Sequence, residues 1–149
     1  MKVKNPMAML RDMAEEKLTD TTQALGSALQ NWQQAVSQRD QLQGYEQEYQ
    51  QSLRSSMMER GMSVADLANH QSFILSLNRV VKQHSQHVAQ CEQAVTEAKA
   101  NWGEDKQRLN AFETLLTRRA TAAAQAESRY EQKMMDEFAQ RSGQKREML

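Results

Sequence analysis

Apolar residues recur along the second half of the chain at spacings that alternate between three and four. The series begins at Ile74 and reaches Tyr130 without a proline, and Gly103 is the only glycine inside it. Its members are Ile74, Leu77, Val81, His84, Val88, Cys91, Val95, Ala98, Trp102, Asp105, Leu109, Phe112, Leu116, Arg119, Ala123, Ala126 and Tyr130. An average spacing of about 3.5 residues is the period of helices that wind around each other. The pattern predicts a single helix of over about 70 residues, roughly 110 Å long.

A weaker series with nearly the same spacing comes before it. Its members are Leu10, Ala14, Leu18, Thr21, Leu25, Ala28, Trp32, Ala35, Arg39, Leu42, Glu46, Tyr49 and Leu53. Gly26 and Gly44 interrupt this segment, and each costs about 1 kcal/mol relative to alanine inside a helix. We therefore expect this first helix to depend on packing against a partner helix.

Between the two series, the chain carries the signals of a helix end followed by a helix start. Gly61 favours the end of the first helix. Ser63 and Asp66 resemble a capping box, and Met62 and Leu67 occupy the positions of a hydrophobic staple. A connection this short makes the two helices antiparallel.

These patterns predict an all-α fold, a long antiparallel two-helix coiled-coil hairpin that forms a single domain over residues 1–149. The first helix is expected at about 7–59, the turn at about 60–63 and the second helix at about 64–141, where Gly143 ends it. Folding at about residue 62 places Leu10 opposite roughly residue 114, so the second helix overhangs the first by roughly 30 Å. Apolar residues of the overhang would have no partner in a monomer.

Composition and charge exclude several classes of function. Aromatic residues make up 5% of the chain, and a two-helix hairpin buries too narrow a stripe for a deep catalytic cleft. The 19 basic and 19 acidic residues balance, which argues against nucleic-acid binding driven by bulk charge. No apolar run approaches the length of a membrane span, and no common catalytic or phosphate-binding motif occurs. We predict a cytoplasmic protein without enzymatic activity, cofactor or direct membrane insertion.

Three potential metal ligands, His84, His87 and Cys91, lie on one face of the second helix. His84 and Cys91 are also members of the apolar series, where a small hydrophobic cysteine packs well. No fourth ligand is evident, and His70 lies too far along the helix to join them. We therefore interpret these residues as packing residues, predict no metal site, and read His70 as a helix-surface residue.

A second apolar row runs beside the main series near the predicted turn. It consists of Phe73, Leu77, Val80 and His84. Either it widens the core near the end of the hairpin, or it forms a face that binds a partner. The pattern alone leaves both interpretations open.

The chain resembles the flagellar FliJ family. The matching stretches are 45–49, 70–84, 106–118, 121–124 and 133–141. The resemblance covers nearly the whole chain, and the C-terminal stretch is its most specific part.

The resemblance implies a non-enzymatic component of the flagellar type III protein export apparatus, similar in shape to the gamma-subunit stalk of rotary ATP synthases. It implies partners in the export ATPase hexamer and its regulator, the cytoplasmic part of the membrane export gate, and export chaperones. The implied role is to bind and promote the ATPase ring and link it to the gate, with chaperone-like roles. It also implies a peripheral location at the cytoplasmic face of the inner membrane. The residues expected at the export gate are Phe73, Leu77, Val80 and His84. Those expected at the ATPase are Tyr130, Lys133, Met134, Met135, Phe138 and Arg141.

Three alternatives remain beside this interpretation. The first is the stalk of a virulence-type III secretion ATPase. The others are a coiled-coil scaffold that dimerises through the overhang, and a dedicated secretion chaperone.

Overall fold

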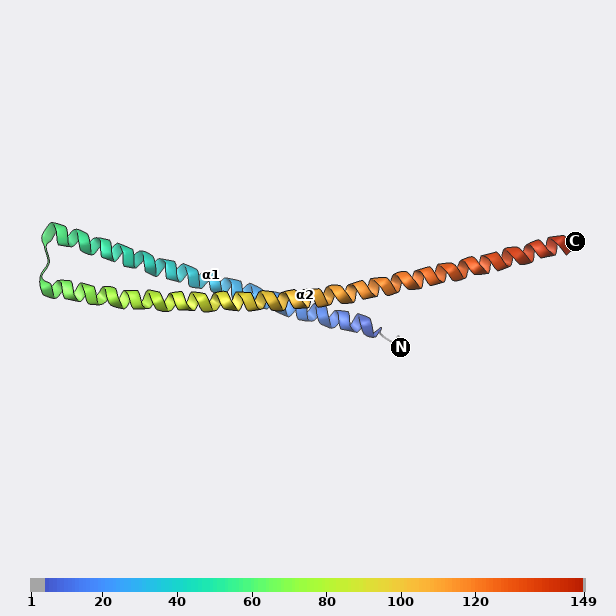
Figure 1. Cartoon of the computed structure of the whole chain (residues 1–149), viewed down its shortest axis with the longest axis horizontal. Helices are drawn as coiled ribbons and strands as arrows, with labels where there is room; N and C mark the ends of the chain where they lie inside the picture. The colour runs from blue at the N-terminus through green and yellow to red at the C-terminus, as the bar shows by residue number, and fades with distance from the viewer. Residues whose placement is uncertain (1–4, 149) are drawn as a thin grey trace. The chain divides into compact units, whose positions relative to one another are not determined.

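The structure is a computed structural model that describes residues 5–148, with side chains described for residues 5–145. Helix α1 comprises Pro6–Arg60 and helix α2 comprises Val64–Met148 (Figure 1). No strand occurs among the described residues. The two long helices pack against each other and are joined by a tight turn, which confirms the prediction of an all-α two-helix hairpin.

Each helix begins at a side-chain cap. The N–H of Met7 donates to Oδ1 of Asn5 at 3.1 Å, and Pro6 suits the first helical position because its missing N–H has no intrahelical partner there. The N–H of Asp66 donates to Oγ of Ser63 at 3.2 Å, the bond expected of an N-cap serine. The predicted start of the second helix is therefore made by Ser63.

The first helix ends at Arg60, and Gly61 follows it. This residue has a φ of 67°, and its N–H donates to the carbonyl of Met57 at 3.3 Å. A left-handed conformation just after the last helical residue satisfies one of the free carbonyls at the helix end and favours glycine. The turn therefore forms where the sequence predicts it.

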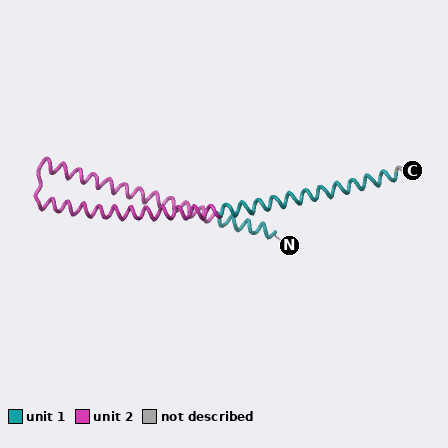
Figure 2. Tube along the Cα trace, in the orientation of Figure 1, with its two compact units in different colours: residues 1–18, 105–149 teal, residues 19–104 magenta. Residues whose placement is uncertain are grey.

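Packing divides the chain into two units, each with segments of both helices (Figure 2). One unit spans Thr19–Glu104, where α1 and α2 run antiparallel on either side of the turn. Every member of the two apolar series in this unit is buried or half-buried. The Nε1–H of Trp102 donates to Oγ1 of Thr22 at 3.1 Å. This pair is centred on residue 62, in agreement with the predicted register.

The other unit comprises residues 1–18 and 105–149. Within its described part, Ala14 and Leu109 are the buried apolar residues. Leu10 is 44% exposed, although the pattern predicts it in the packed series. The position at the matching distance on α2 is the smaller and more polar Thr114, which is exposed as well.

Helix α2 continues well beyond this packed region. Every side chain from residue 117 to residue 141 is exposed, so the packed series ends at Leu116 and the predicted overhang is present. The expected helix end at about residue 141 was wrong, since Gly143 lies within α2, which runs to Met148. Gln, Lys, Arg and Glu around this glycine are strong helix formers, and they offset its cost of about 1 kcal/mol. The expectation of a single domain remains a prediction.

Candidate functional site

An aromatic groove lies between the two helices near the turn, in the unit Thr19–Glu104. We call it the tip groove; its volume is about 500 Å³, and it is lined by Tyr45, Glu48, Tyr49, Ser52, Phe73 and Leu77. The ring centroids of Tyr49 and Phe73 are 4.7 Å apart at an interplanar angle of 49°, within the range where aromatic pairs attract. Tyr45 is 61% exposed and Phe73 is 51% exposed. The groove therefore presents apolar ring surface to solvent.

The four residues expected at the export gate differ in how exposed they are to solvent. Phe73 and Leu77 line the tip groove, and Val80 is 38% exposed. His84 is half-buried, and its Nδ1 is buried without a hydrogen-bond partner among the described residues. Phe73 and Val80 thus lie outside the core, which favours a surface role for the row, whereas His84 is mostly enclosed by packing.

Two tyrosines of the tip groove were not among the predicted site residues. Tyr45 and Tyr49 belong to α1, and the antiparallel register brings this part of α1 beside Phe73. A signal for this was available, because Tyr49 and Phe73 lie at similar distances on either side of the turn. The periodicity along the second helix predicts the row alone, because the side chains that complete the groove belong to the facing helix.

His70 supports the tip groove from outside its lining. The hydroxyl of Tyr49 is hydrogen-bonded to Nδ1 of His70, and their ring centroids are 5.7 Å apart. The interpretation of His70 as a helix-surface residue was wrong, because it is half-buried and bonded across the hairpin. Its role depends on the facing helix, which the spacing along α2 does not show.

A second apolar face lies on the unpartnered part of α2, in the other unit. Tyr130, Met134 and Phe138 follow at intervals of four residues and share one face of the helix. Tyr130 is 64% exposed, Met134 49% and Phe138 72%. Arg141 lies on the same face and Lys133 flanks it. Met135, 72% exposed, points to a different side.

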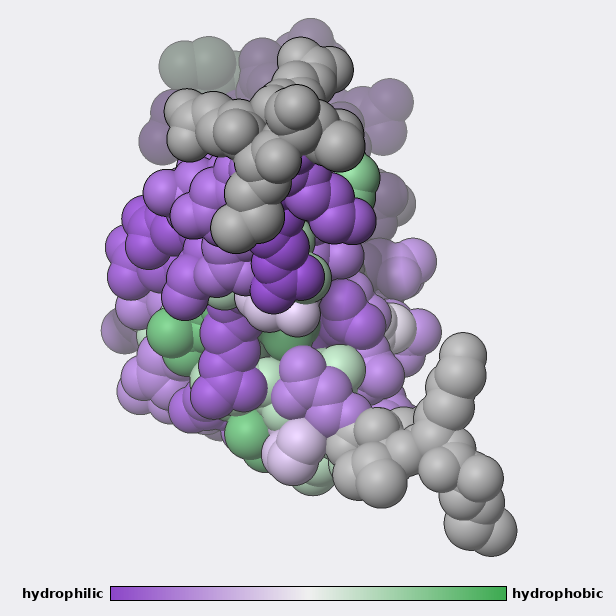
Figure 3. All heavy atoms as spheres, turned by 90° about the vertical axis from the view of Figure 1, so that its right-hand side faces the viewer, coloured by the Kyte–Doolittle hydropathy of each residue, from purple (hydrophilic) through white to green (hydrophobic). Residues whose placement is uncertain are grey.

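These residues make a narrow stripe instead of a broad patch. In Figure 3, hydrophilic side chains cover most of the visible surface and hydrophobic ones appear as separate spots. The exposed apolar side chains of this part of α2 therefore stand singly among charged neighbours.

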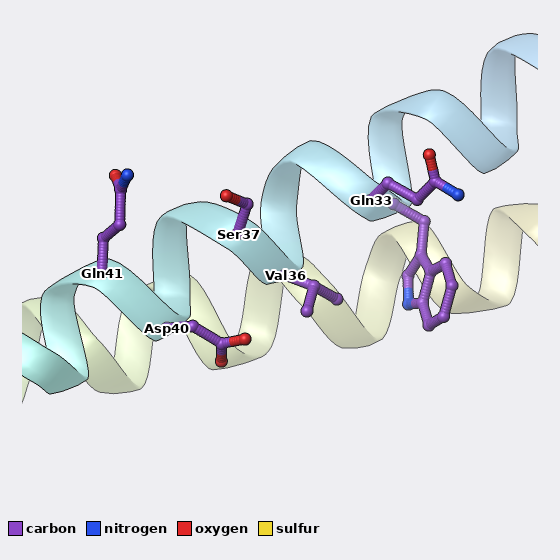
Figure 4. A pocket seen from close by; sticks show the side chains of 6 residues that line it. Gln33, Val36, Ser37, Asp40 and Gln41 are labelled. Carbon is purple, nitrogen blue, oxygen red and sulfur yellow. The ribbon is translucent and has the colours of Figure 1, made fainter.

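Another groove, of about 550 Å³, lies on α1 alone (Figure 4). Its lining residues are Trp32, Gln33, Val36, Ser37, Asp40 and Gln41. They fall on two adjacent rows with a spacing of four, which is the ordinary furrow between ridges of a helix surface. Figure 4 shows Ser37 and Gln41 pointing to one side and Val36 and Asp40 to the other. This set contains no pairing of a nucleophile with a base, and no predicted site residue lies there.

The candidate metal ligands do not form a cluster among the described residues. Sγ of Cys91 lies 3.7 Å from Nε2 of His87, while Nδ1 of His84 is buried. No group of three histidine, cysteine or acidic side chains within the described part of the chain could hold a metal ion.

One carboxylate is buried where α1 and α2 pack in the unit of residues 1–18 and 105–149. Asp105 is 5% exposed. Its Oδ1 lies 3.8 Å from Nζ of Lys17 and 3.4 Å from Nη1 of Arg108, and its Oδ2 has no partner among the described residues. Asp105 occupies a member position of the apolar series, so we interpret it as part of the packing and not as a catalytic acid.

Comparison with known proteins identifies the family. A family model described as flagellar FliJ protein matches residues 2–148. The flagellar FliJ protein of Escherichia coli (strain K12) is 41% identical over 140 residues, which cover 94% of this chain and 95% of that protein. The flagellar FliJ protein of Salmonella typhi is 39% identical over 137 residues, covering 92% of each. Across the described residues, neither helix holds a stretch sufficiently long and apolar to traverse a bilayer. The chain therefore belongs to the FliJ family of flagellar proteins.

Proposed function

We propose that this chain is a non-enzymatic, stalk-like component of the flagellar type III export apparatus. It binds and promotes the ring of the export ATPase through the exposed part of α2, and it contacts the cytoplasmic part of the membrane export gate through the tip groove. The observation that carries the proposal is the stretch 117–141 of α2, where the helix continues but every side chain, apolar ones included, is exposed in the described part of the chain.

The exposed part of α2 has the chemistry expected for the ATPase contact. A single helix is slender enough to enter the central opening of a ring. Tyr130, Met134 and Phe138 supply apolar contacts, while Lys133 and Arg141 supply positive charge beside them. Methionine adapts to changing surroundings because its side chain is flexible and polarizable. Met135 points elsewhere on the helix and would contact a different ring subunit.

The tip groove has the chemistry expected for the gate contact. Interface hot spots are enriched in aromatic side chains that fill or form pockets, and Tyr45, Tyr49 and Phe73 provide them here. Val80 extends the apolar surface along α2. We place the protein in the cytoplasm, held peripherally at the inner membrane by this contact. We further propose that it binds the regulator of the ATPase and export chaperones.

The experiment that tests this function combines a pull-down with an activity assay. The full chain should retain the cognate export ATPase, and adding it should raise the rate of ATP hydrolysis and the fraction of hexamers. Bovine serum albumin at the same concentration serves as the protein control. Absence of both binding and stimulation would exclude the stalk function.

The gate contact can be tested separately. Replacing Phe73 and Val80 by alanine should weaken binding to the cytoplasmic domain of the export gate by about tenfold or more, because hot-spot truncations cost about 2 kcal/mol. Helicity and ATPase stimulation should stay at the level of the unmodified chain. Leu75→Ala is the matched control, since Leu75 is 65% exposed but does not line the groove. Equal gate affinity of both variants would return the row to a packing role.

A second candidate function is favoured by the same exposed stretch of α2. A long helix with an uncovered apolar face can pair with a second copy, which would make the protein a dimerising scaffold. Sedimentation over a wide concentration range distinguishes the two. A scaffold forms concentration-dependent dimers and does not change the ATPase rate.

A further inference from the structure

Tyr49 lies between the tip groove and a smaller cavity, and it lines both. On one side its ring lines that groove and packs against Phe73. On the other side lies a small cavity of about 60 Å³, lined by Tyr49, Ser52, Leu53, Ser56, Met62 and His70. The shape of the groove therefore depends on which way the Tyr49 ring leans.

The hydrogen bond to His70 holds the Tyr49 ring in its present orientation. Tyr49 and His70 come from opposite helices, and the bond joins the tyrosine hydroxyl to Nδ1 of the imidazole. Tyr49 and His70 are each half-buried, so solvent competes only partly for this bond. Without the imidazole, the small cavity would enlarge, and the phenol ring would gain both the space and the freedom to move away from Phe73.

We propose that His70 is a positioning residue for the partner that binds the tip groove. It does not line the groove. It holds Tyr49 against Phe73, so the aromatic wall is already formed before a partner arrives. The inference rests on the proposed gate contact. It assigns to that contact a residue that lies outside the groove lining and acts through Tyr49.

The expected effect follows from the cost of ordering a side chain on binding. Immobilising a mobile side chain at an interface weakens affinity by roughly 2- to 10-fold. His70→Leu, which keeps bulk but removes the polar nitrogen, should weaken binding to the cytoplasmic domain of the export gate by this factor. Tyr49→Phe, which keeps the ring but removes the hydroxyl, should weaken binding to a similar extent.

Two features separate positioning from a general structural role. The double variant H70L/Y49F should bind no more weakly than either single variant, because both remove the same hydrogen bond. His70→Asn places an amide group near the position of Nδ1 and should restore most of the affinity. His87→Leu is the matched control, since His87 is an exposed histidine of α2 outside the groove, and it should bind as the unmodified chain does.

A measurement without the partner tests one step, the positioning of the Tyr49 ring by His70, separately from the gate contact. In NMR spectra of the full chain, His70→Leu should shift the ring resonances of Phe73 and speed the flipping of the Tyr49 ring. Helicity and the melting temperature should change little.

The outcomes are distinguishable. If Phe73→Ala binds the gate domain weakly while His70→Leu binds it with full affinity, the positioning role is overturned. Full affinity of Phe73→Ala would instead refute the gate contact itself. In that case unchanged Phe73 and Tyr49 ring signals in His70→Leu would overturn the positioning of the Tyr49 ring by His70 as well, and altered ring signals would uphold that positioning alone.

Discussion

Asp105 is the one charged side chain that is buried among the described residues, and it takes the place of an apolar residue in the packed series. Both of its ion-pair partners are at the long end of the range, and one carboxylate oxygen has no partner in the described part of the chain. Desolvating a carboxylate is expensive, and weak pairing recovers only part of that cost. Asp105 should therefore reduce the stability of the packing around it.

Asp105→Leu should raise the free energy of unfolding by roughly 1 to 4 kcal/mol, because an apolar side chain with the same branched skeleton removes the desolvation cost. Urea denaturation followed by circular dichroism measures this change. Asp136→Leu is the control, since Asp136 is exposed and its replacement should change stability by less than about 0.5 kcal/mol. A less stable Asp105→Leu variant would mean that the buried carboxylate stabilises the fold.

Gly61 and Gly26 should respond to alanine in opposite directions. At Gly61 the φ of 67° is strained for any residue with a Cβ, so Gly61→Ala should lower the free energy of unfolding by about 1 to 2 kcal/mol. Gly26 lies inside α1 with open space around it, and Gly26→Ala should raise that free energy by up to about 1 kcal/mol. The same denaturation experiment compares the two, and equal signs would contradict the assigned roles.

At the scale of the two helices, the alternating period of three and four sets which sides of α1 and α2 meet. In the unit Thr19–Glu104, the members of both series are buried or half-buried. The register of α1 against α2 is shown by two contacts, that of Trp102 with Thr22 and that of Tyr49 with Phe73. Such a register is open to a direct chemical test, because the chain has one natural cysteine.

Trp32→Cys should form a disulfide with Cys91 within a single chain, since the register places Trp32 level with Glu92, one residue from Cys91, and both Trp32 and Cys91 are half-buried. A disulfide requires Cα atoms within about 7 Å, so Leu29→Cys and Ala35→Cys sample one turn on either side. Non-reducing electrophoresis and mass spectrometry identify the product. The combination of Trp32→Cys with Cys91→Ser is the control, and a product made only between chains would contradict the hairpin.

For the whole molecule, the packed series ends at Leu116 on α2 and every side chain from residue 117 to residue 141 is exposed, while the helix itself continues to Met148. The packed part of the chain therefore does not need the exposed part for its own stability. We therefore expect that the exposed C-terminal part of α2 can be deleted without unfolding the packed part of the chain.

Deleting residues 121–149 should leave the hairpin folded, with unchanged gate binding, and should abolish stimulation of the ATPase. Circular dichroism, gate affinity and the hydrolysis rate measure the three expectations, and the full chain is the reference. Full stimulation by the truncated protein would mean that the ATPase contact lies elsewhere, and the tip groove would become the candidate.

The sequence by itself determined the two helices, the turn and the face along which the helices pack. Each of these depends on a local signal, namely the alternating period, the left-handed Gly61 and the cap at Ser63. The end of α2 was not determined by Gly143, because the propensities of its neighbours outweigh a single glycine.

Only the tertiary structure decided which side chains meet across the hairpin. The placement of Tyr49 between Phe73 and His70 depends on the surfaces of two helices at once, as does the exposure of Leu10. A periodic pattern specifies the side of a helix that is covered, but it does not specify the shape and polarity of what covers it. For that reason the sequence located the row containing Phe73, whereas the groove and its support by His70 came from the packing of α1 against α2.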